Sequence, residues 1–287
     1  MKKMLRALAN RCGLDIVRMG KIKKDYGFYD HFSHESLRQK RFYNIGAGKF
    51  AHQYWTNVDY ANESYRVVQK HPFLQYDLMA QCPLPIESDV AEAVYSSHVI
   101  EHVTDDAVRN MLAESCRILK PGGVIRLTAP DALLIFKAYQ HGDRNFWDWF
   151  HLHFLHDALN MRYKCPPEKA SIHQLFLHLF ATQLSEIGLD DSAPQKCSDA
   201  EIIEVMSAHP AVETLDYFTR RCRFNPDHTR NHLNWWTCEK LIAFLKEAGF
   251  ADPYRSGWGQ SLCPPMRNNA MFDNTVPIMS LYVEAVK

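Results

Sequence analysis

Residues 41 to 130 repeat one pattern, in which a short run of apolar and β-branched residues ends at a glycine or an acidic residue. Such runs, separated by turns and helical segments, are typical of a parallel sheet whose strands are joined by crossover connections. A helix is predicted over residues 105 to 119, because Thr104 can cap it and its apolar residues recur at helical spacing. The expected strands are Phe42–Ile45, Trp55–Val58, a strand ending at Tyr76, Ala91–Ser96 and, after Lys120-Pro121-Gly122-Gly123 ends the helix, Val124–Thr128. The sequence therefore predicts an α/β fold with a mostly parallel sheet.

The second half of the chain has a different character. Residues 141 to 235 are rich in histidine and aromatic residues and are expected to form a helical insertion or cap. Regular structure returns with a helix that Thr237 caps and Gly249 ends, and with a terminal strand in Ser280–Lys287. Four regions are predicted: a basic amphipathic segment in 1–40, the sheet in 41–140, the helical insertion in 141–235 and a return to the core fold in 236–287.

Charge and cysteine content argue against several kinds of partner and site. Lys plus Arg and Asp plus Glu both number 33, so nucleic acid is not an expected partner. The 8 cysteines include no Cys-x-x-Cys pair, which argues against a zinc ribbon and favours reduced thiols in a cytoplasm. No apolar run approaches the roughly 20 residues that a membrane span needs. The basic, amphipathic residues 1 to 24 can pack on the protein itself or lie peripherally on the inner face of a membrane, and both alternatives stay open.

Glycines and acids follow the expected strands, at the edge where an open parallel sheet binds its ligands. Gly46 and Gly48 let backbone N–H groups approach a ligand closely, although such a pair also occurs in ordinary turns. Asp59 ends the second strand, where a carboxylate can accept both hydroxyl groups of a ribose. Asp77 follows the third strand, where it can accept a hydrogen bond from the exocyclic amine of adenine. The alternative for each acid is a solvated turn residue or a helix cap.

Five motifs in this region resemble, in order and spacing, class I S-adenosylmethionine-dependent methyltransferases of the methyltransferase 11 type. They are Gly46-Ala47-Gly48, Asp59, Asp77-Leu78 with Pro83-Leu84-Pro85, Ser96 to Val103, and Leu119 to Gly123. The resemblance implies a Rossmann-like sheet with an antiparallel last strand, S-adenosylmethionine as cofactor and S-adenosylhomocysteine as product. It places the glycine turn by the methionine part of the cofactor, Asp59 by ribose, Asp77-Leu78 by adenine and the residues after the fourth strand near the sulfonium. The implied cofactor-binding residues are Asn44, Gly46, Ala47, Gly48, Asp59, Asp77, Leu78, Ser97 and His98.

The connection between Gly48 and Asp59 is too short for a full crossover helix. In this respect the chain resembles a branch of predicted methyltransferases often encoded with enzymes of surface polysaccharide biosynthesis. That resemblance, with the basic N-terminus and the aromatic second half, favours O-methylation of a sugar or sugar-lipid acceptor by in-line displacement. A neutral hydroxyl should lose its proton as it attacks, so a general base helps, and His98 is the candidate. A purely structural role for His98 is the alternative.

The acceptor pocket is expected to use side chains of the second half. Aromatic and imidazole groups stack on sugar rings and donate hydrogen bonds, although most aromatic residues on helices belong to a core. No metal site is predicted, because no acidic residue stands in an obvious ligand position near the run His151, His153 and His156. The predicted substrate-binding residues are His151, His153, Tyr163, Arg230, His232 and Trp236.

Two other functions are compatible with the sequence. A catalytically silent protein could bind the cofactor and act as a scaffold or as a partner protein at a membrane. The feature that argues against it is the intact set of Gly46, Gly48, Asp59 and Asp77. A histidine-metal hydrolase built on residues 141 to 235 would require a bound metal. The sequence leaves open the identity of the acceptor, the methylated atom and the oligomeric state.

Overall fold

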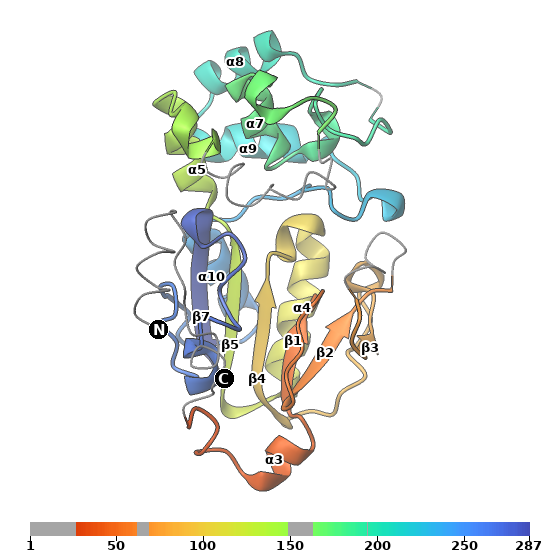
Figure 1. Ribbon diagram of the computed structural model, residues 1–287, viewed down its shortest axis with the longest axis vertical. Helices are drawn as coiled ribbons and strands as arrows, with labels where there is room; N and C mark the ends of the chain where they lie inside the picture. The colour runs from red at the N-terminus through yellow and green to blue at the C-terminus, as the bar shows by residue number, and fades with distance from the viewer. Residues whose placement is uncertain (1–26, 62–68, 149–162, 194) are drawn as a thin grey trace, which may run out of the picture.

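Seven strands form one sheet in the computed structural model, which describes residues 27–61, 69–148, 163–193 and 195–287 (Figure 1). The strand order is β3-β2-β1-β4-β5-β7-β6, and β7 runs antiparallel to both of its neighbours while the other pairs are parallel. This is the Rossmann-like sheet of class I methyltransferases, so the predicted fold class is confirmed. The strands are β1 (Phe42–Ile45), β2 (Trp55–Asp59), β3 (Leu74–Gln75), β4 (Ala91–Ser97), β5 (Leu119–Pro130), β6 (Tyr254–Arg255) and β7 (Ser280–Val286).

Strand β5 begins earlier than the sequence predicts. The preceding helix ends at Ile118, and the strand starts at once at Leu119. Leu119 pairs with Ala91 and Val124 with Ala93, so the extra residues between them form an irregularity within the strand instead of a separate turn. Strand β6 was not predicted, because two residues are too short to show a periodic pattern.

The two predicted helix caps are confirmed. Thr104 accepts a hydrogen bond from the backbone N–H of Ala107 at 3.4 Å, and Thr237 accepts one from Lys240 at 3.1 Å. The α-helices are α3 (His34–Arg38), α4 (Asp105–Ile118), α5 (Ala132–Gln140), α7 (Ile172–His178), α8 (Asp199–Ala208), α9 (Ala211–Thr219) and α10 (Cys238–Glu247). The 3₁₀ helices are η2 (Leu78–Ala80), η3 (Ile100–His102), η4 (Pro167–Lys169), η5 (Thr182–Leu184), η6 (Pro226–His228), η7 (Pro264–Arg267) and η8 (Pro277–Met279).

The two faces of the sheet are covered differently. Helices α4 and α10 bury apolar side chains such as Leu112 and Leu241 against one face. Residues 46 to 54, which join β1 to β2, form no helix, as the short connection predicted. An aromatic cluster, composed of Tyr29, Phe42, Phe50, Trp55, Tyr95 and Phe272, packs on the other face instead.

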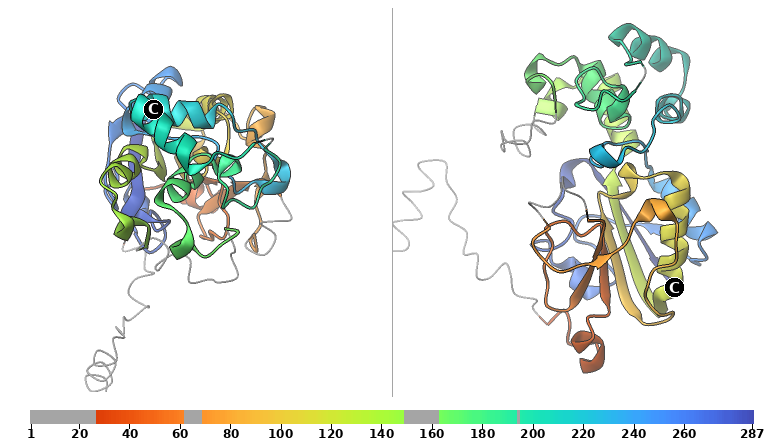
Figure 2. Two further views of the ribbon diagram at one scale, coloured as in Figure 1. Left: turned by 90° about the horizontal axis from the view of Figure 1, so that it is seen from above. Right: turned by 90° about the vertical axis from the view of Figure 1, so that its right-hand side faces the viewer.

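Helices α5, α7, α8 and α9 form a helical layer beyond the carboxyl ends of the parallel strands (Figures 1 and 2). The chain returns from this layer through a return segment, residues 231–236, whose Trp236 carbonyl accepts a hydrogen bond from Ala132 N at 3.0 Å. The helical layer therefore covers the edge of the sheet at which ligands bind in open parallel sheets. The division of the chain into four regions stays a prediction, and residues 1 to 24, His151, His153 and His156 lie outside the described residues.

A buried ionic network joins β5 to β7 and to the loop before β7. Arg126 of β5, Glu284 of β7 and Asp273 of the loop all have fully buried side chains. Arg126 Nε donates to Asp273 Oδ1 at 3.0 Å and Nη1 donates to Glu284 Oε1 at 2.8 Å. Its remaining donors reach the carbonyls of Gln260 and Gly257 at 2.9 and 2.7 Å. The network ties the loop before β7 to the sheet.

None of the helices in the described ranges is long and apolar enough to cross a membrane.

Candidate functional site

The glycine turn after β1 has a backbone that other residues would strain. Gly46 has φ +72° and donates to the Val58 carbonyl at 2.8 Å, and a Cβ on it would lie 2.2 Å from Val99 Cγ2. Gly48 has φ +52°, and nothing lies within 4 Å of the position that its Cβ would take. The close contact with Val99 therefore requires a glycine at position 46, whereas Gly48 leaves open space for a ligand that approaches the turn.

Two backbone N–H groups hold the carboxylate of Asp59 at the end of β2. Gly48 N donates to Oδ2 at 2.7 Å and Tyr60 N donates to Oδ1 at 2.8 Å. A carboxylate offers about four lone-pair sites, so Asp59 can still accept hydrogen bonds from the hydroxyl groups of a ribose. The hydrogen bond between Gly48 and Asp59 thus holds the glycine turn and the carboxylate in place without a ligand.

Asp77 caps η2, which was the alternative considered for it. Its Oδ1 accepts a hydrogen bond from Met79 N at 2.8 Å. The same residue also lines the cavity described next, together with Leu78. The cap orients the carboxylate, so the two roles are compatible.

A cavity at the carboxyl edge of the strands joins these groups. Six of the predicted cofactor residues line it: Gly46, Gly48, Asp59, Asp77, Leu78 and His98. Asn44, Ala47 and Ser97 are not part of the lining, and Ser97 Oγ lies 3.0 Å from Thr128 Oγ1 within the sheet. The complete lining is Ile45, Gly46, Gly48, Val58, Asp59, Tyr60, Tyr76, Asp77, Leu78, Met79, His98, Val99, His102, Val103, Phe224 and Thr229.

His98 follows β4 with an unusual backbone. Its φ of +54° lies in the left-handed region, which a histidine adopts only at a cost of about 1–3 kcal/mol. Its ring is held on both sides, because Nδ1 lies 3.1 Å from Glu101 Oε1 and Nε2 lies 2.7 Å from Ser280 Oγ. The strained backbone and the two contacts fix the ring at the cavity wall.

Glu101 is the buried acid of the site, with 1% of its surface exposed. Burial alone raises its pKa, but the hydrogen bond and charge of His98, followed by the charges of His102 and His232, lower the pKa to about 2. The carboxylate is therefore ionised at neutral pH. It is a negative charge surrounded by three imidazole rings.

The predicted acceptor residues are placed apart from one another. His232 lies in the return segment beside His102, with ring centroids 4.7 Å apart, whereas Arg230 is exposed. Trp236 is fully buried against Phe244, and Tyr163 packs on His178 at 4.5 Å. None of these described residues lines the cavity.

Ten residues of the cavity wall were not predicted from the sequence, among them His102, Phe224 and Thr229. His102 carries a sequence signal, since it follows Glu101 in the motif after β4. Phe224 and Thr229 carry none, because they reach the cavity through the fold of the helical layer.

Part of the chain is similar to one known protein family. Residues 45–127, less than a third of the chain, match the family model described as a methyltransferase domain. No curated protein matches the sequence. A Thermotoga maritima structure described as a SAM-dependent methyltransferase, possible histamine N-methyltransferase, is 11% identical with a TM-score of 0.38, covering 94% of this chain and 97% of that one. A SAM-dependent methyltransferase from Archaeoglobus fulgidus is 11% identical with a TM-score of 0.41, covering 100% and 95%.

The residues present fit S-adenosylmethionine. The open space beside Gly48 leaves room for a ligand, and the fixed carboxylate of Asp59 offers acceptors for its ribose. The sheet has the antiparallel last strand that the resemblance implied, and the region that matches the family, residues 45–127, contains the glycine turn, Asp59 and His98. The protein is an S-adenosylmethionine-dependent methyltransferase, and S-adenosylmethionine is its cofactor.

Proposed function

We propose that the protein transfers a methyl group to a hydroxyl oxygen of a small-molecule acceptor, with a sugar or a sugar-lipid as the first candidate. The observation that carries the proposal is the single cavity that contains the glycine turn, Asp59, Asp77, His98 and His102 under the helical layer. An acceptor that enters between the layer and the sheet edge would meet these groups together. Such a site can act by holding the acceptor aligned and dry.

The cavity lining supports six of the nine proposed cofactor contacts. Bound S-adenosylmethionine supplies an electrophilic methyl group on a sulfonium centre. Gly46 and Gly48 would hold its methionine part, Asp59 its ribose, and Asp77 its adenine. Asn44, Ala47, Leu78 and Ser97 complete the proposed set from the walls and from the sheet behind the turn.

His98 is the proposed general base. Its Nδ1 faces the acceptor-only carboxylate of Glu101, which favours the tautomer with a proton on Nδ1 and leaves Nε2 to accept one. Nε2 lies 2.7 Å from Ser280 Oγ, and this hydroxyl can donate its one proton either to Nε2 or to the carbonyl of Val276, also at 2.7 Å. An acceptor hydroxyl that replaces the Ser280 hydroxyl at His98 Nε2 would be within the distance that proton transfer requires.

The walls on the acceptor side suit a hydroxylated ring. Thr229 Oγ1 is buried and has no hydrogen-bond partner among the described residues, so it is available to a polar ligand. Phe224 and Tyr60 add aromatic surface on which a sugar ring can stack. Arg230 and His232, which were proposed from the sequence, closely follow Thr229 in the chain. The other proposed acceptor-binding residues are His151, His153, Tyr163 and Trp236.

The test is transfer of a labelled methyl group to a panel of nucleotide sugars and lipid-linked sugars. We expect an alkali-stable methyl ether on the sugar and loss of transfer in Asp59→Ala, with Asp252→Ala as the control, since Asp252 is exposed and outside the cavity. Label found only in protein, RNA or amines would reject the proposal. Cofactor binding without turnover on any acceptor would favour the silent scaffold instead.

His98→Asn tests the base, because asparagine tolerates a left-handed backbone. We expect kcat to fall about 10²–10⁴-fold with little change in KM. An unchanged kcat would show that His98 only packs the site.

A location at the cytoplasmic face of a membrane belongs to the same proposal, because a lipid-linked acceptor would be presented there. Binding of the full chain to vesicles that contain anionic lipid, lost when the basic residues among 1 to 24 are neutralised, would support it.

A further inference from the structure

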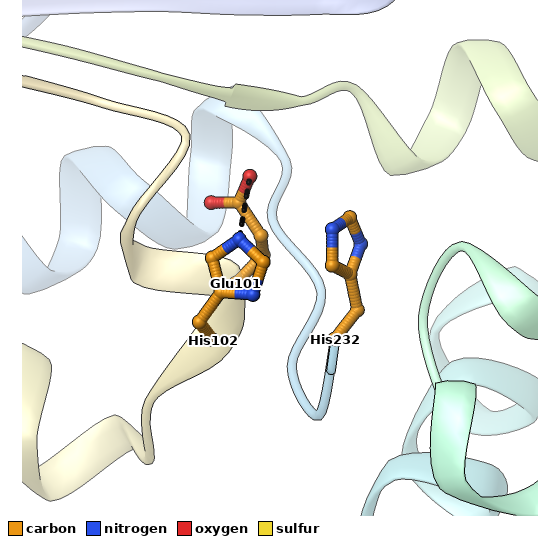
Figure 3. Close-up of side chains that lie close together, drawn as sticks. All are labelled: Glu101, His102 and His232. Atoms are coloured by element: carbon orange, nitrogen blue, oxygen red, sulfur yellow. Dashed lines mark ion pairs between the residues drawn. The ribbon is translucent and has the colours of Figure 1, made fainter. Parts of the chain in front are cut away.

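Glu101, His102 and His232 bring one carboxylate and two imidazole rings together beside the cavity (Figure 3). Each offers one donor atom, and the three atoms all lie within 4.8 Å of one another. Glu101 and His102 come from η3, whereas His232 comes from the return segment. We propose that these three side chains bind a divalent transition-metal cation.

Backbone carbonyls set the tautomers of both imidazole rings. His102 Nδ1 lies 3.0 Å from the carbonyl oxygen of Asn231, and His232 Nδ1 lies 2.6 Å from that of Leu179. A carbonyl oxygen only accepts, so each neutral ring must carry its proton on Nδ1 and its lone pair on Nε2. A bond from the second ring nitrogen to a carbonyl is the arrangement that orients metal-binding histidines in proteins.

The environment of Glu101 is an independent observation in favour of a bound cation at this place. Its carboxylate is buried; Oε1 pairs with His98, whereas Oε2 has no hydrogen-bond partner among the described residues. Its nearest contacts are ion-pair distances of 3.1 Å to His98 Nδ1 and 4.0 Å to His102 Nε2. A buried carboxylate is stable only when it is paired or bound to a metal, and a cation between Glu101, His102 and His232 would meet that need.

The backbone holds the three ligands in place from two sides. Leu233 N donates to the Glu101 carbonyl at 2.9 Å, which fixes the return segment beside η3. His232 is fixed to the helical layer, because its N–H donates to Thr182 Oγ1 and its carbonyl accepts from Thr182 N, both at 3.0 Å. Ligand atoms about 2.1 Å from one ion lie about 3–3.5 Å apart, whereas the three donor atoms here lie within 4.8 Å of one another. Side-chain rotations that move each donor atom by about an ångström would therefore complete the site.

Two imidazoles and one carboxylate favour Zn²⁺, Mn²⁺, Fe²⁺ or Co²⁺ over Mg²⁺ and Ca²⁺, which prefer oxygen ligands. Three protein ligands also leave coordination positions open. His102 lines the cavity next to His98, so the open positions would face the acceptor. The metal would then select acceptors with two neighbouring oxygens, such as a vicinal diol, and this last step rests on the proposed function.

Metal binding can be tested without any methyl transfer. Full-length protein, stripped with a chelator, is titrated with Co²⁺ and with Zn²⁺ by calorimetry, and the Co²⁺ complex is followed by its visible absorption. The variants are His102→Gln and His232→Gln, and the control is His209→Gln, a half-exposed histidine that pairs with Glu213 on the outside of the helical layer. Thermal unfolding of each protein, with and without Zn²⁺, shows whether it is folded.

We expect about one Co²⁺ per chain, visible bands typical of histidine and carboxylate ligands, and a Zn²⁺-dependent rise in melting temperature. His102→Gln and His232→Gln should each weaken binding at least about tenfold, whereas His209→Gln should bind as the wild type does. Absence of stoichiometric binding of both metals, or equal binding by His232→Gln and the wild type, would overturn the proposal. Because the titration contains no acceptor, failure to methylate sugars would leave this result unaffected.

Discussion

Substitution of Arg126 by methionine should destabilise the fold strongly. Methionine keeps most of the apolar volume but removes the guanidinium that pairs with Asp273 and Glu284, whose side chains are both 0% exposed. Removal of one partner from a buried ion pair costs about 3–5 kcal/mol, because the remaining charge is left uncompensated. We take about 4 kcal/mol as the expected loss, which corresponds to a fall in melting temperature of about 6–8 °C for a chain of 287 residues.

The assay is thermal and urea-induced unfolding followed by circular dichroism, with Arg109→Met as the matched control. Arg109 also forms two ion pairs, with Asp106 and Glu247, but its side chain is 46% exposed, so its removal should cost at most about 1 kcal/mol. The triple variant Arg126→Met, Asp273→Asn and Glu284→Gln removes the orphaned charges and should recover a large part of the loss. Equal losses in Arg126→Met and Arg109→Met would refute the reasoning.

Three further outcomes follow from individual contacts. Gly46→Ala should cost about 1–3 kcal/mol of stability and weaken S-adenosylmethionine binding in calorimetry, because its Cβ would clash with Val99; Gly46→Ala with Val99→Ala should recover only the steric part. Thr237→Ala should lower the unfolding free energy by about 1 kcal/mol through loss of the α10 cap, measured by urea denaturation. Burial raises the pKa of the Cys222 thiol to about 12, so at pH 8 iodoacetamide should modify exposed Cys82 well before Cys222, as peptide mass spectrometry would show.

Local signals explain which parts of the fold the sequence predicted. Strands β1 and β2 are apolar runs bounded by turn residues, and α4 begins at a threonine cap, so a few neighbouring residues decide each element. The six proposed cofactor residues of the cavity lie at the end of a strand or within three positions after it, and the strand order brings them to one edge. These features depend on short stretches of chain and on the parallel arrangement.

The rest depends on contacts between distant residues. His232 reaches Glu101 only because the return segment pairs with η3, and no pattern near residue 232 encodes that pairing. The partners of Arg126 lie 147 and 158 positions away, so a charged residue in a strand could not be recognised as the centre of a buried network. Sequence motifs therefore predicted more of the cavity lining at the strand ends than in the segments that follow the helical layer.

The aromatic cluster has a consequence for how the enzyme assembles. Phe50 follows the glycine turn and packs on Phe272 at 5.4 Å, while Trp55 packs on Phe272 at 4.9 Å. A helix that covered this face would form from neighbouring residues, but here the cover comes from chain segments more than two hundred positions apart. Contacts of such long range form late, because closing the intervening loop costs entropy before the contact is gained. Affinity for S-adenosylmethionine should therefore appear only in the last phase of refolding, which makes cofactor binding a reporter of the complete native state.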